Sequence, residues 1–272
     1  MAHDQRNTVV VGLSGPSSGG KTTISRYLRS ILPNAVILHQ DDFYIAEAEL
    51  PLDPRTGLAN WDCAEAINFE AMVNVLEHLK GHSGQFPIGF ESKEDQNLVG
   101  AKEHGAPVAP HVLDALRIKV LQVVDQKRQQ SPASEDPVYL IVDGFLLYAN
   151  ERLRNAIDVR LFITASYAVL KERRESRKGY VTMEGYWEDP PGYFDDIVWP
   201  NYLDCNKPFI GLTNAVVKGE LSGEYDDPHP KNATLRLDQT TQGIDIISTD
   251  KVSIETMVIH AIDLLVKRLK QL

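Results

Sequence analysis

The sequence predicts an α/β fold in which a parallel β-sheet carries helices on both faces. Apolar β-branched runs, of which Val9–Val11 is the first, alternate with segments whose apolar residues recur at helical spacing. Such runs are typical of parallel strands that are buried on both sides. The length of 272 residues suits one domain with insertions or two small domains. No internal repeat is present, and of the two we predict a single domain over residues 1–272.

The individual elements can be placed along the chain from these patterns. Strands are expected within 8–14, 35–44, 138–148, 158–164 and 243–249. Helices are expected over 21–32, 65–80, 112–128, 167–177 and 254–269. Two tracts rich in Gly, Pro and charged residues interrupt this alternation, at about 82–110 and 216–234. We interpret both tracts as surface insertions that add little to the core.

Composition excludes several classes of function. The net charge is −10 and no basic run is present, so nucleic acid is not an expected partner. Cys63 and Cys205 are the only cysteines, and they form neither a metal-binding spacing nor a disulfide framework, which fits a reducing compartment. The polar start of the chain lacks a secretory core, and no apolar stretch is long enough to span a membrane. We therefore expect a cytoplasmic protein; its oligomeric state is not predicted.

A glycine-rich turn directly follows the first expected strand. The stretch "GPSSGGKT", Gly15–Thr22, matches the pattern G-x-x-x-x-G-K-[ST] of phosphate-binding P-loops and stands between a strand and a helix, as the pattern requires. Its backbone N–H groups and the helix N-terminus attract phosphate, Lys21 adds a positive charge, and the Thr22 hydroxyl can bind Mg²⁺. A chance glycine-rich turn is disfavoured because motif and context agree. A dinucleotide-binding turn is excluded because G-x-G-x-x-G is absent.

Acidic residues follow two further expected strands. Asp41 and Asp42 begin the tract "DDFY", and Asp143 precedes Gly144. Ligands of parallel α/β sheets bind at the carboxyl ends of the strands. A carboxylate there can orient Mg²⁺ or accept a proton from an attacking hydroxyl. Each acid could instead serve as a turn residue or helix cap.

Two more groups of residues have chemistry suited to a nucleotide site. Arg173, Arg174 and Arg177 lie near the end of an expected helix, in a lid over about 171–192, and could neutralise a transferring phosphoryl group. The alternative is an ordinary solvated helix face. Trp61 could stack on a flat ring while Asp62 binds sugar hydroxyls. The alternative is a hydrophobic staple at Trp61, with Asp62 as the N-cap of the next helix.

The order of these motifs resembles a known family. The tracts "GLSGPSSGGKTT", "QDDFY", "NWD", "DGFLLY", "RRESR" and "PPGYFDDIVWPNY" occur as in nicotinamide riboside kinases, which belong to the uridine kinase-like branch of P-loop kinases. The resemblance covers most of the chain apart from the two insertions. It implies a nucleoside-kinase-like P-loop fold with an arginine-bearing lid. It also implies ATP-dependent phosphorylation of the ribose 5′-hydroxyl of nicotinamide riboside, with Mg²⁺ as cofactor; nicotinic acid riboside is a further candidate substrate.

The resemblance also assigns roles to individual positions. Asp41 becomes the catalytic base near the metal, assisted by Lys21 and Arg173, and the metal ligands become Thr22, Asp41 and Asp143. Asp143 stands where relatives often have glutamate, which favours contact with the metal through water. ATP would be bound by Gly15, Pro16, Ser17, Ser18, Gly19, Gly20, Lys21, Thr22, Thr23, Arg174, Arg177, Thr241, Gln242 and Gly243. The nucleoside would contact Asp41, Asp42, Phe43, Tyr44, Trp61, Asp62, Arg173 and Tyr180.

Three other functions compete with this interpretation. A kinase for uridine or another ribosyl compound is the nearest, although Trp61 suits a flat cationic ring. A GTP-binding switch is disfavoured because "NKPF" at 206–209 lacks the aspartate of N-K-x-D. A non-catalytic nucleotide-binding protein would not need Lys21, Thr22 and Asp41 together.

Overall fold

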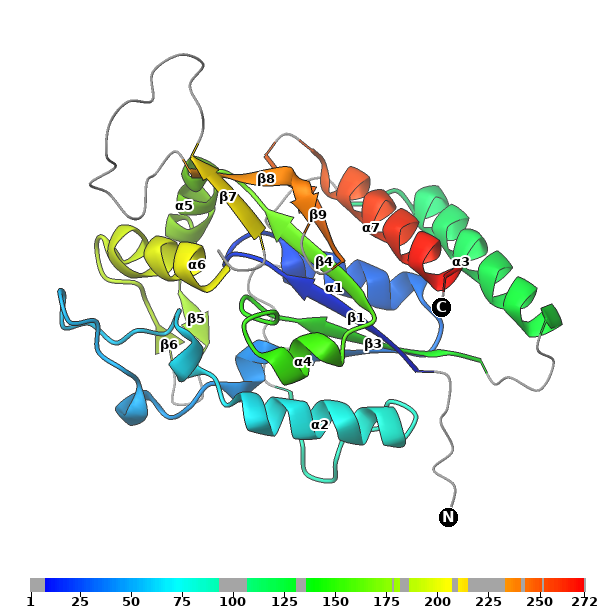
Figure 1. Cartoon of the computed structure of the whole chain (residues 1–272), viewed down its shortest axis with the longest axis horizontal. Helices are drawn as coiled ribbons and strands as arrows, with labels where there is room; N and C mark the ends of the chain where they lie inside the picture. The colour runs from blue at the N-terminus through cyan, green and yellow to red at the C-terminus, as the bar shows by residue number, and fades with distance from the viewer. Residues whose placement is uncertain are drawn as a thin grey trace.

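A five-stranded parallel sheet forms the centre of the molecule (Figure 1). The computed structural model describes residues 8–92, 107–130, 136–177, 179–181, 186–206, 210–214, 233–240, 243–250 and 252–271. The strand order is β2-β3-β1-β4-β9. The strands are β1 (Thr8–Ser14), β2 (Ala35–His39), β3 (Val138–Asp143), β4 (Val159–Thr164) and β9 (Ile244–Ser248). The predicted parallel α/β fold is confirmed.

The strands are buried on both faces, as their apolar sequences require. Strand β1 is central and pairs with β3 and β4, with Val10 opposite Leu140 and Leu13 opposite Leu161. Because side chains alternate between the faces of a sheet, Val9 and Val11 enter one apolar cluster while Val10 enters the other. Each face of the sheet is therefore covered by its own core.

Helices supply the other half of each core. One face is covered by α1 (Lys21–Ile31), α3 (Pro110–Gln130) and α7 (Ile254–Leu269), which contact one another (Figure 1). The other is covered by α2 (Phe69–Gly81), α4 (Glu151–Asn155), α5 (Tyr167–Glu175) and α6 (Trp199–Asn206). Helix α2 begins four residues later than predicted, because Asn68 rather than an earlier residue accepts the capping bond from the backbone N–H of Ala71.

Two small pairs of antiparallel strands lie outside the central sheet. Strands β5 (Tyr180–Val181) and β6 (Tyr186–Trp187) pair within the expected lid, of which residues 178 and 182–185 lie outside the described part of the chain. Strands β7 (Ile210–Asn214) and β8 (Ala233–Thr240) pair antiparallel and flank the second expected insertion. Residues 215–232, which include most of that tract, also lie outside the described residues.

The prediction that residues 82–110 form a surface insertion is partly wrong. Its two ends pack: Val108 is buried in the core beside α1 and α3, while Phe86 and Phe90 pack against the core on the other face. The polar composition of the tract masks these few apolar residues. Residues 93–106, between the two ends, lie outside the described part.

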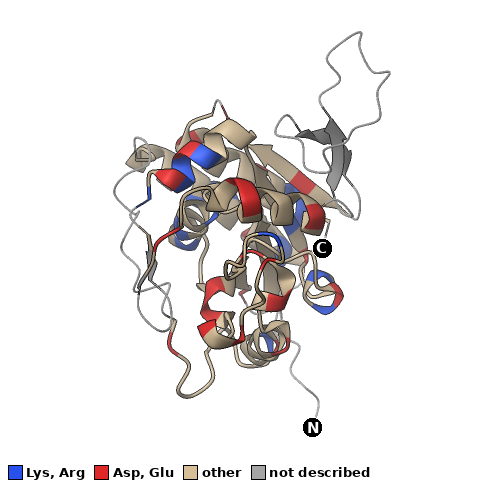
Figure 2. Ribbon diagram, turned by 90° about the vertical axis from the view of Figure 1, so that its left-hand side faces the viewer, with Lys and Arg blue, Asp and Glu red and all other residues tan. Residues whose placement is uncertain are grey.

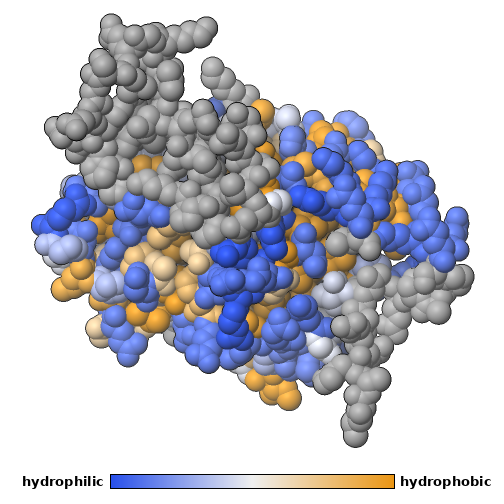
Figure 3. Space-filling model, viewed as in Figure 1, coloured by the Kyte–Doolittle hydropathy of each residue, from blue (hydrophilic) through white to orange (hydrophobic). Residues whose placement is uncertain are grey.

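The described surface is polar and carries charges of both signs. On the ribbon of Figure 2, basic residues are scattered among acidic ones and form no continuous band in this view. In Figure 3, apolar residues appear on the exposed face as separate patches. Among the residues described, no helix is both long enough and apolar enough to cross a membrane.

Candidate active site

The sheet topology brings the predicted site residues to one edge. The connection after β1 runs through α1 on one face, whereas the connection after β3 runs through α4 on the other. Adjacent parallel strands whose connections leave toward opposite faces form the usual ligand-binding crevice of open α/β sheets. The P-loop follows β1, Asp143 ends β3, and Asp41 follows β2 beside them, so the candidate site lies at this edge.

The P-loop needs glycine at specific backbone positions. Gly15 has φ 141° and approaches β4 so closely that a Cβ atom would lie 2.0 Å from the carbonyl oxygen of Ile163. Gly20 caps helix α1 in the left-handed region, with φ 95°. Between them the backbone N–H of Gly19 donates to the carbonyl oxygen of Pro16 at 3.1 Å. These constraints fold the loop around the N-terminus of α1, where phosphate is stabilised.

Polar groups within this loop suit a phosphate ligand. Lys21 is buried, and its Nζ donates to the carbonyl oxygen of Pro16 at 3.0 Å. Burial lowers the pKa of Lys21, while the carboxylates of Asp143 and Asp41 act in the opposite direction. The buried Ser18 hydroxyl has no hydrogen-bond partner among the described residues. A phosphate oxygen would satisfy this hydroxyl and the Lys21 ammonium, so the loop fits the phosphates of ATP.

Asp143 is buried at the end of strand β3, where it contacts side chains of strand β2 and of helix α1. It lies opposite His39 in the β2–β3 register, and its Oδ2 is 3.4 Å from His39 Nδ1. Ser25 Oγ of helix α1 donates to the same oxygen at 3.1 Å. Burial alone would raise the pKa of Asp143, but hydrogen bonds from His39 and Thr22 and the charge of Lys21 hold it below its ordinary value. Asp143 is therefore kept ionised beside Thr22.

Asp41 lies in the turn that follows β2, and we call Gln40–Phe43 the base loop. The side-chain oxygen of Gln40 accepts hydrogen bonds from the backbone N–H groups of Phe145 and Leu146, both at 2.9 Å, which fixes the loop to the turn after β3. The Asp41 side chain remains accessible to solvent. The surrounding protein atoms and the nearby Asp143 carboxylate raise its pKa, whereas Lys21 opposes the rise. Asp41 thus has the basicity and access that a proton acceptor needs.

The oxygen atoms near the P-loop fit Mg²⁺ better than a metal ion whose ligands all come from the protein. No cluster of three or more His, Cys, Asp or Glu side chains suited to a metal occurs among the described residues. Mg²⁺ usually keeps several waters and uses one or two protein oxygens together with substrate phosphates. Thr22, Asp143 and Asp41 offer oxygens of this kind, and hydrogen bonding connects Thr22 to Asp143.

Aromatic side chains form a wall next to the base loop. The rings of Tyr44 and Trp61 meet edge to face with centroids 5.3 Å apart, and Tyr44 stacks on Phe145 at 6.1 Å. Trp61 also lies against Trp187, with centroids 5.7 Å apart. The alternative in which Asp62 caps the next helix is wrong, because Asn68 caps α2. Trp61 itself is buried, whereas Tyr44 and Trp187 are partly exposed and offer aromatic surface on which a flat ring could stack.

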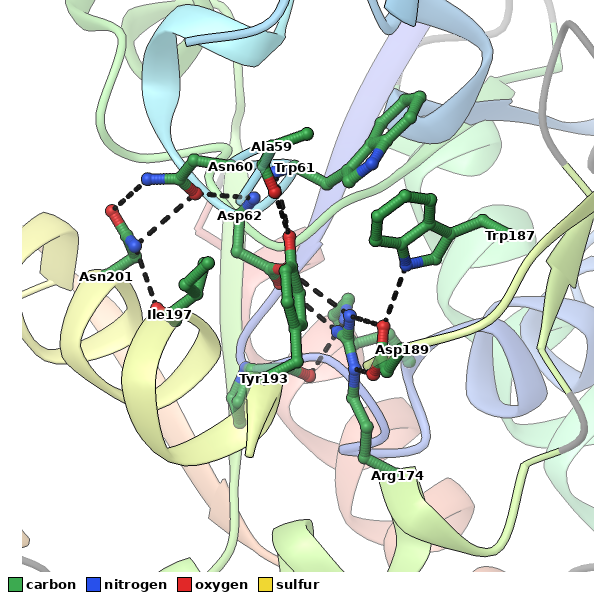
Figure 4. Close-up of polar contacts among 12 residues, drawn as sticks. Ala59, Asn60, Trp61, Asp62, Arg174, Trp187, Asp189, Tyr193, Ile197 and Asn201 are labelled. Atoms are coloured by element: carbon green, nitrogen blue, oxygen red, sulfur yellow. Dashed lines mark hydrogen bonds and ion pairs between the residues drawn. The ribbon is translucent and has the colours of Figure 1, made fainter. Parts of the chain in front are cut away.

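Asp62 is bound to a lid arginine inside the protein (Figure 4). Arg174 Nη1 and Nη2 donate to the two carboxylate oxygens of Asp62 at 3.2 and 3.3 Å. The same guanidinium donates to Asp189 at 2.6 and 3.1 Å, and Asp189 also accepts from Trp187 Nε1 at 3.0 Å. Burial raises the pKa of Asp62, and the Arg174 charge acts against that rise. Arg174 thereby connects the lid to the Trp61–Asp62 loop.

Tyr193 fixes the backbone of the same loop. Its hydroxyl donates to the carbonyl oxygen of Ala59 at 2.8 Å and accepts from the backbone N–H of Trp61 at 3.1 Å. The Arg174 guanidinium lies 5.8 Å from the centre of its ring. The residues that sequence reasoning missed are His39, Trp187, Asp189 and Tyr193. Tyr193 belongs to the quoted tract "PPGYFDDIVWPNY", but nothing in the sequence shows that this tract contacts residues 59–62.

The remaining predicted residues lie around this centre. Arg173 donates to the side-chain and backbone oxygens of Thr249 at 3.0 and 3.3 Å, and Arg177 is close enough to Lys21 to lower its pKa. Tyr180 begins strand β5, and Gly243 precedes β9 with φ 69°. Thr241 and Gln242 lie outside the described residues. The ligand contacts assigned to all of these residues stay predictions.

Comparison with known proteins identifies the family. No protein-family model matches the chain. A nicotinamide riboside kinase of Schizosaccharomyces pombe is 35% identical over 82% of this chain and 86% of its own length. The nicotinamide riboside kinase of Saccharomyces cerevisiae is 32% identical over 84% of this chain and 87% of its own length. Human nicotinamide riboside kinase 1 is 29% identical, covering 77% of this chain and 82% of its own length.

Among solved structures, one titled a possible uridine kinase from Bacillus stearothermophilus covers 76% of this chain and 87% of its own chain, with 16% sequence identity and a TM-score of 0.39. The two fungal relatives carry the assignment by sequence, because both exceed 30% identity over most of their own length. The similarity to these two fungal kinases shows that the chain belongs to the family of nicotinamide riboside kinases.

Proposed function

We propose that the protein transfers the γ-phosphoryl group of ATP to the ribose 5′-hydroxyl of nicotinamide riboside, producing the mononucleotide used in NAD biosynthesis. One observation carries the proposal: Trp61 and Asp62, adjacent in sequence, join an aromatic wall and a carboxylate at the edge that holds the P-loop. A cationic pyridinium ring is attracted to aromatic faces and to nearby carboxylates. Nicotinic acid riboside is a second candidate substrate, because it carries the same ring. We also predict a cytoplasmic location.

In this proposal Asp41 acts as the general base. It accepts the proton of the 5′-hydroxyl as that oxygen forms a bond to the γ-phosphorus and the bond from phosphorus to the departing ADP oxygen breaks. Its raised pKa and its access to solvent support this role. Lys21 would bind the phosphates and offset negative charge that develops during transfer.

The remaining groups orient the reactants. Mg²⁺, bound through oxygens such as those of Thr22 and Asp143, would neutralise phosphate charge when present. Asp62 would bind the ribose hydroxyls while Arg174 holds its carboxylate in place. Arg173 lies in the last turn of α5 and Arg177 two residues beyond its end, where the lid would exclude water from the phosphoryl group.

A kinase assay across a panel of nucleosides tests the proposal. The purified protein would be incubated with ATP and Mg²⁺ plus nicotinamide riboside, nicotinic acid riboside or uridine, and both ADP and the nucleoside monophosphate would be quantified. We expect the highest kcat/KM for a pyridine riboside and no turnover by the Lys21→Ala variant, whose fold circular dichroism would verify. A clear preference for uridine would favour another kinase of the uridine kinase-like branch.

A further inference from the structure

Residues 86–92, which belong to the tract predicted to be a surface insertion, contact the base loop. Phe86 and Phe90 stack with ring centroids 4.8 Å apart. Phe90 stacks in turn on Phe43, the last residue of the base loop, at 5.9 Å. Phe43 is buried, so the stack joins this segment to the core side of the loop that carries Asp41.

A second contact of the same segment reaches the residue next to the base. Ser92 Oγ donates a hydrogen bond of 2.6 Å to Asp42 Oδ2. A hydrogen bond to an ionised carboxylate is stronger than one between neutral groups. The segment therefore contacts two of the four residues of the base loop, one through aromatic packing and one through a charged hydrogen bond.

Hydrogen bonds with other elements hold both ends of the base loop. Gln40 accepts hydrogen bonds from the turn after β3 at the start of the loop. At its end, the carbonyl oxygen of Phe43 accepts from the backbone N–H of Asn68 at 2.8 Å. Between these two anchors, Ser92 restrains the side chain of Asp42, one residue from Asp41.

We propose that residues 86–92 position the base loop for phosphoryl transfer, with Phe90 and Ser92 as positioning residues. The inference rests on the proposed function, because it gives the segment a role relative to Asp41. Effective catalysis requires the base to lie within hydrogen-bond reach of the 5′-hydroxyl, and a misplacement of about 1 Å can reduce the rate by about 10². Loss of either contact would let Asp41 sample unproductive positions while the P-loop stays intact.

The test uses four variants of the full chain. Phe90→Ala removes the stack, Ser92→Ala removes the hydroxyl and Ser92→Thr keeps it. Ile88→Ala is the matched control, because Ile88 belongs to the same segment but is fully exposed. Steady-state kinetics with nicotinamide riboside and ATP and a thermal melt would be measured for each. We expect kcat to fall about tenfold for Phe90→Ala and about threefold or more for Ser92→Ala. KM for ATP should stay within about twofold, and Ser92→Thr and Ile88→Ala should match the wild type.

The outcomes separate this inference from the proposed function. If the wild type phosphorylates no nucleoside, the proposed function fails. If the wild type is active but Phe90→Ala and Ser92→Ala keep its kcat, the segment has no positioning role and the inference is overturned. If Phe90→Ala does not fold, the two Ser92 variants decide, since both should keep the wild-type melting temperature. If kcat falls equally in Ser92→Ala and Ser92→Thr, the proposed role of the hydroxyl is contradicted.

Discussion

His39 and Asp143 lie side by side at the carboxyl ends of neighbouring parallel strands, with His39 Nδ1 3.4 Å from Asp143 Oδ2. Both side chains are almost completely buried. The pair connects strand β2, which precedes the base loop, to the Asp143 carboxylate beside Thr22. The imidazole of His39 gives the Asp143 carboxylate a fixed partner.

Substitution of His39 is expected to disturb catalysis through Asp143. His39→Leu leaves a buried carboxylate without one of its partners, which costs about 1–3 kcal/mol of stability. It should also lower kcat/KM by about tenfold. His39→Asn places an amide N–H near the position of Nδ1, so it should retain most of the activity. Steady-state kinetics and urea denaturation would compare the two variants; equal activity of His39→Leu and the wild type would contradict a positioning role.

Replacement of Arg174 should be among the most destabilising single changes. Arg174→Met would leave the buried Asp62 carboxylate, and the half-buried Asp189, without their shared cation. Removal of one partner from a buried ion pair typically costs about 3–5 kcal/mol. Denaturant unfolding of this variant would be compared with that of Arg117→Met. Arg117 is exposed, so its replacement should change the free energy of unfolding by about 0.5 kcal/mol or less. Equal stability of the two variants would show that the Asp62–Arg174–Asp189 cluster is not a stabilising unit.

Trp61 is expected to affect nucleoside binding more than ATP binding. Stacking and cation–π attraction together are worth about 1–3 kcal/mol, so Trp61→Ala should raise KM for nicotinamide riboside by about tenfold to a hundredfold. KM for ATP should change little, and Trp61→Phe should have an intermediate effect. The measurement is a KM series with both substrates. A lower melting temperature without a change in the nicotinamide riboside KM would mean that Trp61 only packs against Tyr44 and Trp187.

The two cysteines should be unreactive in the folded protein. Burial raises the pKa of both Cys63 and Cys205 to about 11, from 9.0. At pH 8 the thiolate fraction of each is then about one in a thousand, a hundredfold below that of an unshifted thiol. Titration with a chromogenic disulfide reagent should therefore be slow for the native protein and release two equivalents quickly in denaturant. Rapid reaction of either thiol in the native state would contradict this.

The sequence was sufficient for the sheet, because Val9–Val11 and the other apolar runs leave few alternatives to buried parallel strands. It was also sufficient for the P-loop, since "GPSSGGKT" between a strand and a helix has a single strong interpretation. Both predictions depend on residues that are neighbours in the chain.

Contacts between distant segments could not be predicted. Arg174 and Asp62 are 112 residues apart, and Ser92 and Asp42 are 50 apart, so no local pattern indicates either pair. The composition of 82–110 predicts a surface insertion that adds little to the core. Because Phe86, Phe90 and Val108 pack, deletion of residues 86–110 should reduce both stability and activity.

The most direct test of the proposed phosphoryl transfer is to follow the phosphorus resonances of reactants and products during the reaction. Phosphorus NMR of the protein with ATP, Mg²⁺ and nicotinamide riboside should show one new phosphomonoester on the 5′-oxygen for each ADP formed. Asp41→Asn should slow its appearance by about 10² or more, since general bases contribute to that extent. Release of inorganic phosphate in place of the monoester, or an unchanged rate in Asp41→Asn, would contradict the account.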